Sequence, residues 1–263
     1  MSATVRSMTG CCAELYELPV VGYLLGQSFH PGGPKLTRQL ASASLVSPNA
    51  EVLDLACGNG NSARIVAADF GATVTGCDFS AVNLQRAAST SIAAGLERQT
   101  MFVRGSAQRL PFDARSFDVA LCECSLCLFE DLDGALQEIF RALKPGGRIG
   151  VSDFFLNAAV PGILDGLLGQ ALCVASARST DALRLAFTQA GFEHVRVRIV
   201  NWALVEMISR VRHRLDVLAA SASSPDLALP TDWGDPGPVL AALEHFIDAG
   251  GTGYLIITAR KPG

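Results

Sequence analysis

Short apolar runs alternate with helix-like patterns through the middle of this 263-residue chain. In the segments between the runs, apolar residues recur about every 3.6 positions, which is typical of amphipathic helices. Strand, helix and strand in succession form the unit of a parallel sheet with helices packed on its faces. The sequence therefore predicts an α/β fold. The predicted strands are 51–55, 73–78, 101–104, 117–123 and 148–153, and the helices are 62–69, 81–94 and 132–143.

The same alternation continues to the end of the chain, so we expect a single domain over residues 51–263. Further helices are predicted at 163–175 and 180–190, and further strands at 194–200 and 254–260. Residues 1–50 carry no strand pattern and are interpreted as an N-terminal helical cap segment. Residues 202–252 form a long connection, which we interpret as an insertion that contains helices.

Composition narrows the possible functions. Apolar residues make up 49% of the chain and charged residues 17%, which indicates a globular protein. The formal charge of -4 and the lack of a basic run argue against nucleic-acid binding. No apolar stretch reaches the roughly 18 residues that cross a bilayer, so we expect no membrane partner, a cytoplasmic location and a small-molecule substrate.

A glycine-rich loop joins the first predicted strand to the first predicted helix. Its residues run from Asp54 to Gly60 with the sequence DLACGNG. Glycines at this point allow the backbone to approach a bound ligand closely. The second strand ends at Asp78, where a carboxylate can accept hydrogen bonds from ribose hydroxyls. NAD-binding proteins share this arrangement, so the loop predicts an adenosine-containing cofactor without deciding which one.

Three later segments decide between these cofactors. They are FDVA at 117–120, LKPGGR at 143–148 and GSAQRLPF at 105–112. In this order they resemble class I S-adenosylmethionine-dependent methyltransferases. The resemblance implies a Rossmann-like, seven-stranded sheet with helices on both faces and an antiparallel last strand. It also implies S-adenosyl-L-methionine as cofactor, although Ser106 stands where the family usually has an adenine-binding Asp. The implied cofactor-binding residues are Asp54, Ala56, Gly58, Gly60, Asp78, Phe79, Ser106, Ala107 and Glu123.

The fourth strand leads into a group of cysteines, three of the eight in the chain. The segment DVALCEC at 118–124 resembles arsenite S-adenosylmethionine methyltransferases, which have an arsenic-binding cysteine at the position of Cys124. Cys173 follows at nearly the separation that this family shows for its second arsenic cysteine, and Cys11 and Cys12 are candidates for the N-terminal thiols. The resemblance implies Cys12, Cys124 and Cys173 as arsenic ligands, with Cys11 and Cys127 as further catalytic candidates.

Thiols suit such a reaction because trivalent arsenic is soft and prefers thiolate sulfur. Three thiolates would leave its lone pair directed at the methyl carbon, so that no general base is needed. The positive sulfonium should lower the pKa of neighbouring thiols. A further cysteine pair or an added thiol reductant would reduce the methylated arsenic. Cys57, Cys77 and Cys122 are interpreted as packing residues, because they lie in or beside predicted strands.

Two other functions stay open. One is a methyltransferase that acts on carbon, nitrogen or oxygen of a small metabolite, with Glu123 or His30 as the proton acceptor. His30 precedes Pro31-Gly32-Gly33-Pro34, which we interpret as a flexible, lid-like stretch. The other is a zinc-binding regulatory module, in which Cys122, Cys124 and Cys127 supply the thiolates.

Overall fold

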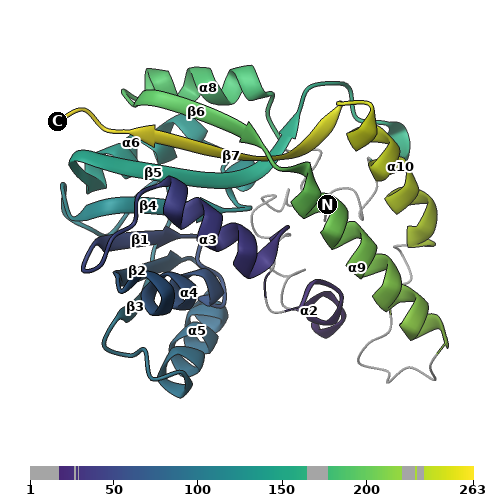
Figure 1. The fold of residues 1–263 in the computed structure, drawn as a ribbon, viewed down its shortest axis with the longest axis horizontal. Coiled ribbons are helices and arrows are strands. Elements are labelled where there is room, and N and C mark those ends of the chain that lie inside the picture. Colours follow the sequence, from purple (N-terminus) through teal and green to yellow (C-terminus); the bar gives the residue numbers. More distant parts are fainter. Residues whose placement is uncertain (1–17, 27, 29, 165–176, 221–228, 230–233) are drawn as a thin grey trace, which may run out of the picture.

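One seven-stranded sheet forms the centre of the computed structural model (Figure 1), which describes residues 18–26, 28, 30–164, 177–220, 229 and 234–263. The strand order is β3-β2-β1-β4-β5-β7-β6, and β7 runs antiparallel to both of its neighbours. The predicted fold class and the antiparallel last strand are therefore confirmed. The strands are β1 (Glu51–Leu55), β2 (Thr73–Asp78), β3 (Thr100–Arg104), β4 (Phe117–Glu123), β5 (Leu143–Leu156), β6 (Glu193–Ile199) and β7 (Thr252–Arg260).

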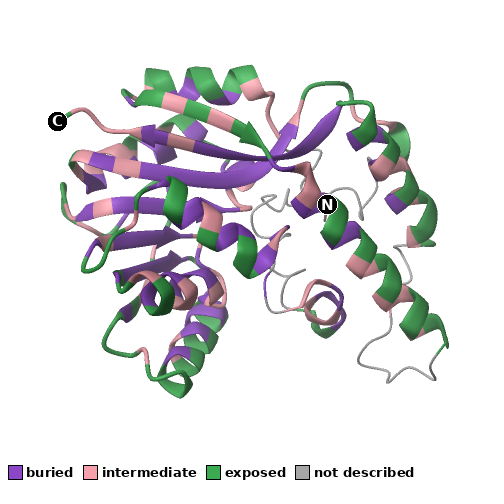
Figure 2. Ribbon diagram, in the orientation of Figure 1, coloured by how far each residue is buried: buried purple, intermediate pink, exposed green. Residues whose placement is uncertain are grey.

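Helices cover both faces of the sheet, and each face has its own apolar core. The first core joins α3, α4, α9 and α10 to the sheet, and the second joins α6 and α8 to the opposite face. Figure 2 shows the consequence, since the central strands are buried and the outer sides of the helices are exposed. The helices are α2 (Pro19–Leu25), α3 (Gly33–Ala43), α4 (Asn61–Phe70), α5 (Ala81–Ala93), α6 (Leu132–Ala142), α8 (Thr180–Gln189), α9 (Asn201–Ala220) and α10 (Pro236–Asp248), with short 3₁₀ helices η1 (Leu126–Leu128) and η2 (Gly162–Leu164).

The strand order reverses between β1 and β4. On one side of this point the chain proceeds from β1 to β2 and β3, and on the other from β4 to β5. At such a reversal the connections leave in opposite directions, so a crevice opens beyond the carboxyl ends of the two strands. The glycine-rich loop follows β1 and the cysteine group follows β4, so both enter this crevice.

The prediction of a flexible, lid-like stretch after His30 is wrong. Gly33 already begins α3, and Gly32 caps the helix with a φ of 76°. A Cβ atom on Gly32 would lie 2.7 Å from the Cβ of Leu36 and 2.9 Å from the Cβ of Ala203 in α9. The turn is thus packed between two helices, and the two prolines and two glycines serve to start α3 rather than to open a lid.

Strand β5 begins five residues earlier than the sequence predicts, because Leu143 already pairs with β4 and the Lys144-Pro145-Gly146-Gly147 segment lies between Leu143 and the next paired residue, Arg148. Leu143 pairs with Phe117, and the Nζ atom of Lys144 lies 2.9 Å from both carboxylate oxygens of Asp118. The register shifts between Phe117 and Val119, so the segment is accommodated as an irregularity of the ladder.

Some predictions concern residues outside the described part of the chain. Of the predicted helix 163–175, only the 3₁₀ turn at its start is described. Cys11, Cys12 and Cys173 also lie outside the described residues. Among the residues that the structure does describe, none of the helices has the length and apolar character needed to cross a bilayer.

Candidate active site

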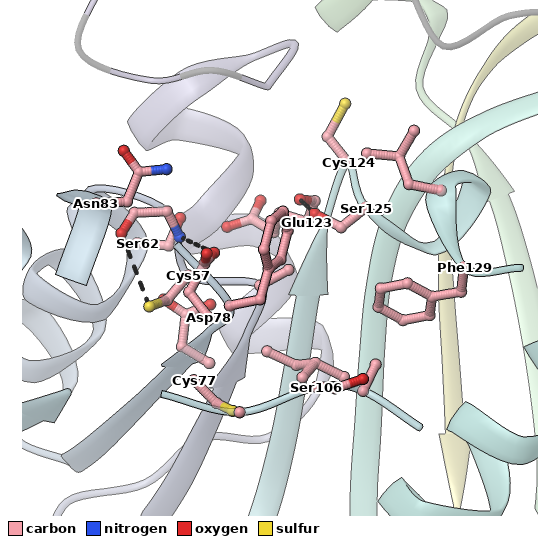
Figure 3. A pocket seen from close by; sticks show the side chains of 18 of the residues that line it. Cys57, Ser62, Cys77, Asp78, Asn83, Ser106, Glu123, Cys124, Ser125 and Phe129 are labelled. Atoms are coloured by element: carbon pink, nitrogen blue, oxygen red, sulfur yellow. Dashed lines mark hydrogen bonds between the residues drawn. The ribbon is translucent and has the colours of Figure 1, made fainter. Parts of the chain in front are cut away.

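A cavity of about 570 Å³ lies at the carboxyl ends of β1, β2 and β4 (Figure 3). The loops after β1, β2, β3 and β4 line it, together with Ser28 and His30 from the segment before α3. Eight of the nine predicted cofactor residues line this cavity, as does Cys124, whereas Gly60 is not among the lining residues. The crevice expected from the strand order is therefore a single cavity that the cofactor loop and the β4 loop share.

The glycine-rich loop has a backbone that most side chains would not permit. Gly58 and Gly60 have φ values of 52° and 72°, and Ala56 is held at 56° although it is not glycine. A Cβ atom on Gly60 would lie 2.8 Å from the Cβ of Ala87 and equally close to the ring of Phe102. The loop thus needs glycine at position 60 for conformation and for space.

Asp78 holds this loop from the end of β2. Its Oδ2 atom accepts a hydrogen bond from the backbone N–H of Gly58 at 2.9 Å, and its Oδ1 atom accepts one from Ser80 at 2.8 Å. Burial raises the pKa of Asp78, while these backbone hydrogen bonds lower it. Each carboxylate oxygen retains a lone pair, so the geometry fits the predicted hydrogen bonds to ribose hydroxyls.

Asp54 at the carboxyl end of β1 is almost fully buried, and its Oδ2 atom has no hydrogen-bond partner in the structure. Its pKa is raised well above 3.8, first by burial and then by the negative charges of Glu123 and Asp78. An unpaired buried carboxylate is costly unless a ligand completes it. The ammonium and sulfonium groups of S-adenosylmethionine supply positive charge, so Asp54 and the cofactor fit one another.

Three predicted residues lie where the adenosine part of the cofactor is expected. Phe79 follows Asp78 and presents an apolar side chain that is 43% exposed, although it lines the cavity. Ser106 is exposed and donates a hydrogen bond to the Gln108 side chain, whereas Ala107 is buried. The departure from the usual Asp at position 106 thus replaces a carboxylate by a Ser–Gln pair at this end.

Glu123 and His30 form a buried pair at the other end of the cavity. The Nδ1 atom of His30 lies 3.6 Å from Oε2 of Glu123, and both side chains are less than a tenth exposed. The same nitrogen is 3.0 Å from the carbonyl oxygen of Pro31, and Nε2 is 3.3 Å from Oγ1 of Thr37. Both ring nitrogens therefore face oxygen atoms.

Two hydroxyl groups fix the Glu123 carboxylate. Thr37 in α3 donates a hydrogen bond to Oε1 at 2.9 Å, and Ser152 in β5 donates one to Oε2 at 3.2 Å. The hydroxyl of Tyr254 in β7 donates in turn to the Ser152 carbonyl at 3.2 Å. Burial raises the pKa of Tyr254 well above 10, and the nearby Cys124 and Asp153 raise it further. The hydroxyl of Tyr254 therefore keeps its proton and donates it in this hydrogen bond.

The cysteines of the β4 segment diverge. Cys124 directly follows β4 with a φ of 54°, and its N–H donates to the Ser152 carbonyl at 2.7 Å. This left-handed residue interrupts the strand, so that Cys124 is half-buried and lines the cavity while Cys122 stays buried in the sheet core. Cys127 packs into the opposite core and does not line the cavity. In the described residues, no group of three His, Cys, Asp or Glu side chains is arranged to hold a metal ion, which removes the support for a zinc module on Cys122, Cys124 and Cys127.

Cys57 and Cys77 are buried, as the sequence indicated, and they line the cavity as well. Figure 3 shows their thiols and that of Cys124 at three separate places around the cavity. Burial raises the pKa of Cys57, and it raises the pKa of Cys77 to about 12, with further contributions from Asp54 and Asp78. Burial raises the pKa of Cys122 in the same way. These three thiols are therefore protonated near neutral pH and are poor metalloid ligands.

Sequence reasoning missed Thr37 and the role of Ser152 beside Glu123. Thr37 belongs to α3 and approaches Glu123 across 86 positions of sequence, so no local motif connects the two. The only available signal was the pairing of β4 with β5, which places Ser152 opposite Glu123.

Comparison with known proteins agrees with this geometry. Residues 53–151 match the family model described as "Methyltransferase domain". Methyltransferase GfsG of Streptomyces halstedii is 28% identical over 234 residues, which cover 88% of this chain and 81% of the relative. Other curated relatives include a botryococcene C-methyltransferase and sterol 24-C-methyltransferases, and the chain spans only about a third to a half of their length, 32% of the first and 36% to 42% of the sterol enzymes.

Solved structures share the fold over the whole chain. Phosphoethanolamine N-methyltransferase 2 of Haemonchus contortus, in complex with S-adenosyl-L-methionine, has a TM-score of 0.82 at 18% identity and covers 100% of this chain, with 62% of that chain covered. The [4+2]-cyclase SpnF has a TM-score of 0.77 at 25% identity, with 100% and 99% covered.

The fold and the shared cavity define the class I methyltransferase architecture. Residues 53–151 match a methyltransferase domain, and the fold and the shared cavity agree with a methyltransferase that uses S-adenosylmethionine as its cofactor.

Proposed function

We propose that this protein transfers the methyl group of S-adenosylmethionine to a small-molecule acceptor and that the His30–Glu123 pair takes up the acceptor's proton. The observation that supports the proposal most strongly is the position of this pair. Both side chains are buried, and the Nδ1 atom of His30 lies 3.6 Å from the Oε2 atom of Glu123. The pair lines the same cavity as the cofactor loop. The relatives include C-methyltransferases of botryococcene and sterols, so carbon is one candidate acceptor atom.

The chemistry requires a place for one proton. When bound, the cofactor supplies an electrophilic methyl carbon; the acceptor forms a bond to it while the carbon–sulfur bond breaks and its electron pair stays on sulfur. A carbon, nitrogen or oxygen acceptor that carries hydrogen must then lose a proton. A proton held on Nδ1 of His30 faces Oε2 of Glu123 at 3.6 Å. Thr37 and Ser152 keep the carboxylate in this position.

The test is a methyl-transfer assay with labelled cofactor and a panel of phenols, amines and isoprenoid alkenes. For any acceptor that the wild type methylates, Glu123→Gln and His30→Gln should each reduce turnover by roughly 10²- to 10⁴-fold. Cofactor affinity, measured by calorimetry, should change by less than about tenfold, because the glycine-rich loop and Asp78 stay intact. Matched controls are Glu97→Gln and His213→Gln, which change the same residue types outside the cavity.

Two results would contradict the proposal. One is an acceptor that the Glu123 and His30 variants methylate as fast as the wild type. The other is a wild-type protein that binds S-adenosylmethionine but transfers no methyl group to any acceptor class in the panel.

Arsenite methylation is the second candidate, and Cys124 is the observation that favours it. The half-buried Cys124 is strained at a φ of 54° and lines the cavity beside Glu123. Its predicted partners Cys11, Cys12 and Cys173 lie outside the described residues, and an added thiol reductant is part of this prediction. Labelled cofactor with arsenite and glutathione tests it. Methylated arsenic from the wild type, lost in Cys124→Ser and Cys173→Ser with cofactor binding retained, would support thiol chemistry; methylation by both variants at the wild-type rate would exclude it.

A further inference from the structure

The cavity is unusual in the sign of its charges. Five carboxylates line it, and among the described lining residues there is neither a lysine nor an arginine. Asp54 and Asp78 lie at the cofactor end and Glu123 at the β4 end, while Glu130 and Asp131 are exposed at the rim. A second observation indicates that the cavity receives positive charge: among the described residues, the buried Oδ2 atom of Asp54 has no hydrogen-bond partner.

Arginines near the cavity do not line it. Three of them contact backbone carbonyl oxygens of lining residues, and Arg64 also donates to the side chain of Asn61 at 3.5 Å. The contacts are Arg64 to the oxygen of Asn59 at 2.9 Å, Arg104 to the oxygen of Phe79 at 3.1 Å and Arg178 to the oxygen of Phe129 at 3.1 Å. None of the three side chains lines the cavity.

The segments outside the described residues contain few basic residues. Residues 1–17, 27, 29, 165–176, 221–228 and 230–233 contain a single basic residue, Arg6. The same segments contain five acidic residues, Glu14, Glu17, Asp165, Asp226 and Asp232. A phosphate or carboxylate group of an acceptor, at the β4 end of the cavity, would therefore lack the arginine or lysine that normally pairs with it.

The cofactor uses only part of the negative charge. Its cationic groups suit Asp54, and its ribose suits Asp78, which leaves Glu123, Glu130 and Asp131 toward the acceptor. An anionic acceptor would have to lose its hydration shell in front of these three carboxylates. A neutral or cationic acceptor would not, and a positive charge that develops on it would be stabilised.

We propose that the cavity selects its acceptor by charge, admitting neutral or cationic molecules and excluding those that carry a phosphate, diphosphate or carboxylate group. This inference rests on the proposed function for the identity of the acceptor site, but it concerns which class of acceptor enters. For an acceptor that the enzyme methylates, adding such an anionic group should reduce the specificity constant by about 100-fold or more.

Cys124 provides a probe that does not depend on turnover. Its thiol lines the cavity and can be labelled with two methanethiosulfonate reagents of similar size, one with a trimethylammonium group and one with a sulfonate group. The ratio of the two labelling rates cancels the reactivity of the thiol itself and reports the local potential. Rates are read by peptide mass spectrometry for Cys124 and normalised to the same thiol in urea-unfolded protein. We expect the cationic reagent to react about tenfold faster or more.

Rim variants separate local charge from net charge. Glu130→Gln combined with Asp131→Asn should lower the ratio several-fold, and Asn at position 131 preserves the cap that accepts the Gly134 N–H at 2.8 Å. Asp133→Asn is the matched control, because it removes one exposed charge two residues away that does not line the cavity. It should leave the ratio nearly unchanged.

Each outcome decides the inference. Equal rates, a faster sulfonate reagent or no labelling of Cys124 by either reagent would overturn it. Competition with Cys124 labelling tests entry into the cavity independently. The competitors are two matched pairs, ethanolamine with phosphoethanolamine and geraniol with geranyl diphosphate, and only the member without phosphate in each pair should slow labelling. A normal labelling ratio without any methyl transfer would contradict the proposed function alone, whereas transfer to the phosphorylated members would contradict charge selection alone.

Discussion

The two ends of the cavity are built in different ways. The cofactor end is made of consecutive residues, since Asp54 to Gly60 follow one strand and Asp78 ends the next. The acceptor end brings together Thr37, Glu123 and Ser152 from α3, β4 and β5, which meet only in the folded sheet. A ligand shared by a large class of proteins is thus bound by local backbone geometry, whereas the site for the acceptor depends on long-range packing.

The buried acids at the two ends show the same contrast. Among the described residues, the Oδ2 atom of Asp54 has no hydrogen-bond partner, whereas both oxygens of Glu123 accept hydrogen bonds from hydroxyl groups. An acid with one oxygen left unpartnered is suited to receive a charged ligand, and an acid held at both oxygens is suited to act in a fixed position. Variants that exchange these features should affect binding at one end and turnover at the other.

The largest effect at the cofactor end should come from Gly60→Ala. The new Cβ atom would lie 2.8 Å from Ala87 and from the Phe102 ring in a backbone with a φ of 72°, so the loop must shift. We expect cofactor affinity to fall by at least about 100-fold and the free energy of unfolding by about 1–3 kcal/mol. Calorimetry and urea unfolding measure both. Gly95→Ala is the control, because its φ of 69° is similar but nothing lies within 4 Å.

Asp54→Asn should weaken binding and stabilise the protein without ligand. Burial raises the pKa of Asp54 in the folded protein well above its ordinary value of 3.8. At a pH between the unfolded and the folded pKa, the folded protein therefore holds a proton that the unfolded chain has lost. The free energy of unfolding should therefore fall as the pH rises through this window. The Asn variant should lose that part of the dependence, gain about 1 kcal/mol at pH 7 and bind cofactor roughly tenfold more weakly. A variant less stable than the wild type at pH 7 would argue against an unpaired charge.

Thr37→Val should act at the acceptor end. It removes the hydroxyl that donates to Glu123 at 2.9 Å but keeps the shape of the side chain. We expect turnover to fall about tenfold with cofactor affinity unchanged, and Thr37→Ser to restore most of it. If the Ser variant were no better than the Val variant, packing rather than the hydrogen bond would explain the loss. The pH profile of turnover is the second readout, since a purely structural role would not shift it.

The smallest effect is expected for the buried thiols. The pKa of Cys77 is raised to about 12, so very little thiolate is present at pH 8, and Cys57 is more strongly affected in the same direction. Iodoacetamide should therefore label neither residue in the folded protein within the time that labels both in urea. Cys77→Ala should change turnover by less than about twofold. Rapid labelling of Cys77 would contradict the buried position.

Local patterns predicted most of the fold and the cofactor end because strands, glycine turns and terminal acids are encoded within a few residues. The start of β5 was missed because Leu143 pairs with Phe117, a contact between distant segments that overrides the local turn signal. The stretch after His30 was misinterpreted as a lid because its glycines and prolines also suit a helix start packed on α9. Thr37 was missed entirely, since its partner Glu123 lies 86 residues away.

The central claim is that His30 and Glu123 act as one proton-accepting unit, and a double-mutant cycle tests it most directly. Single-turnover methyl transfer would be measured for the wild type, His30→Gln, Glu123→Gln and the double variant at saturating cofactor. Because each single variant already disables the pair, we predict that the double variant is no more than about threefold slower than the slower single variant. A double variant whose loss equals the product of the two single losses would show two independent residues and contradict the account.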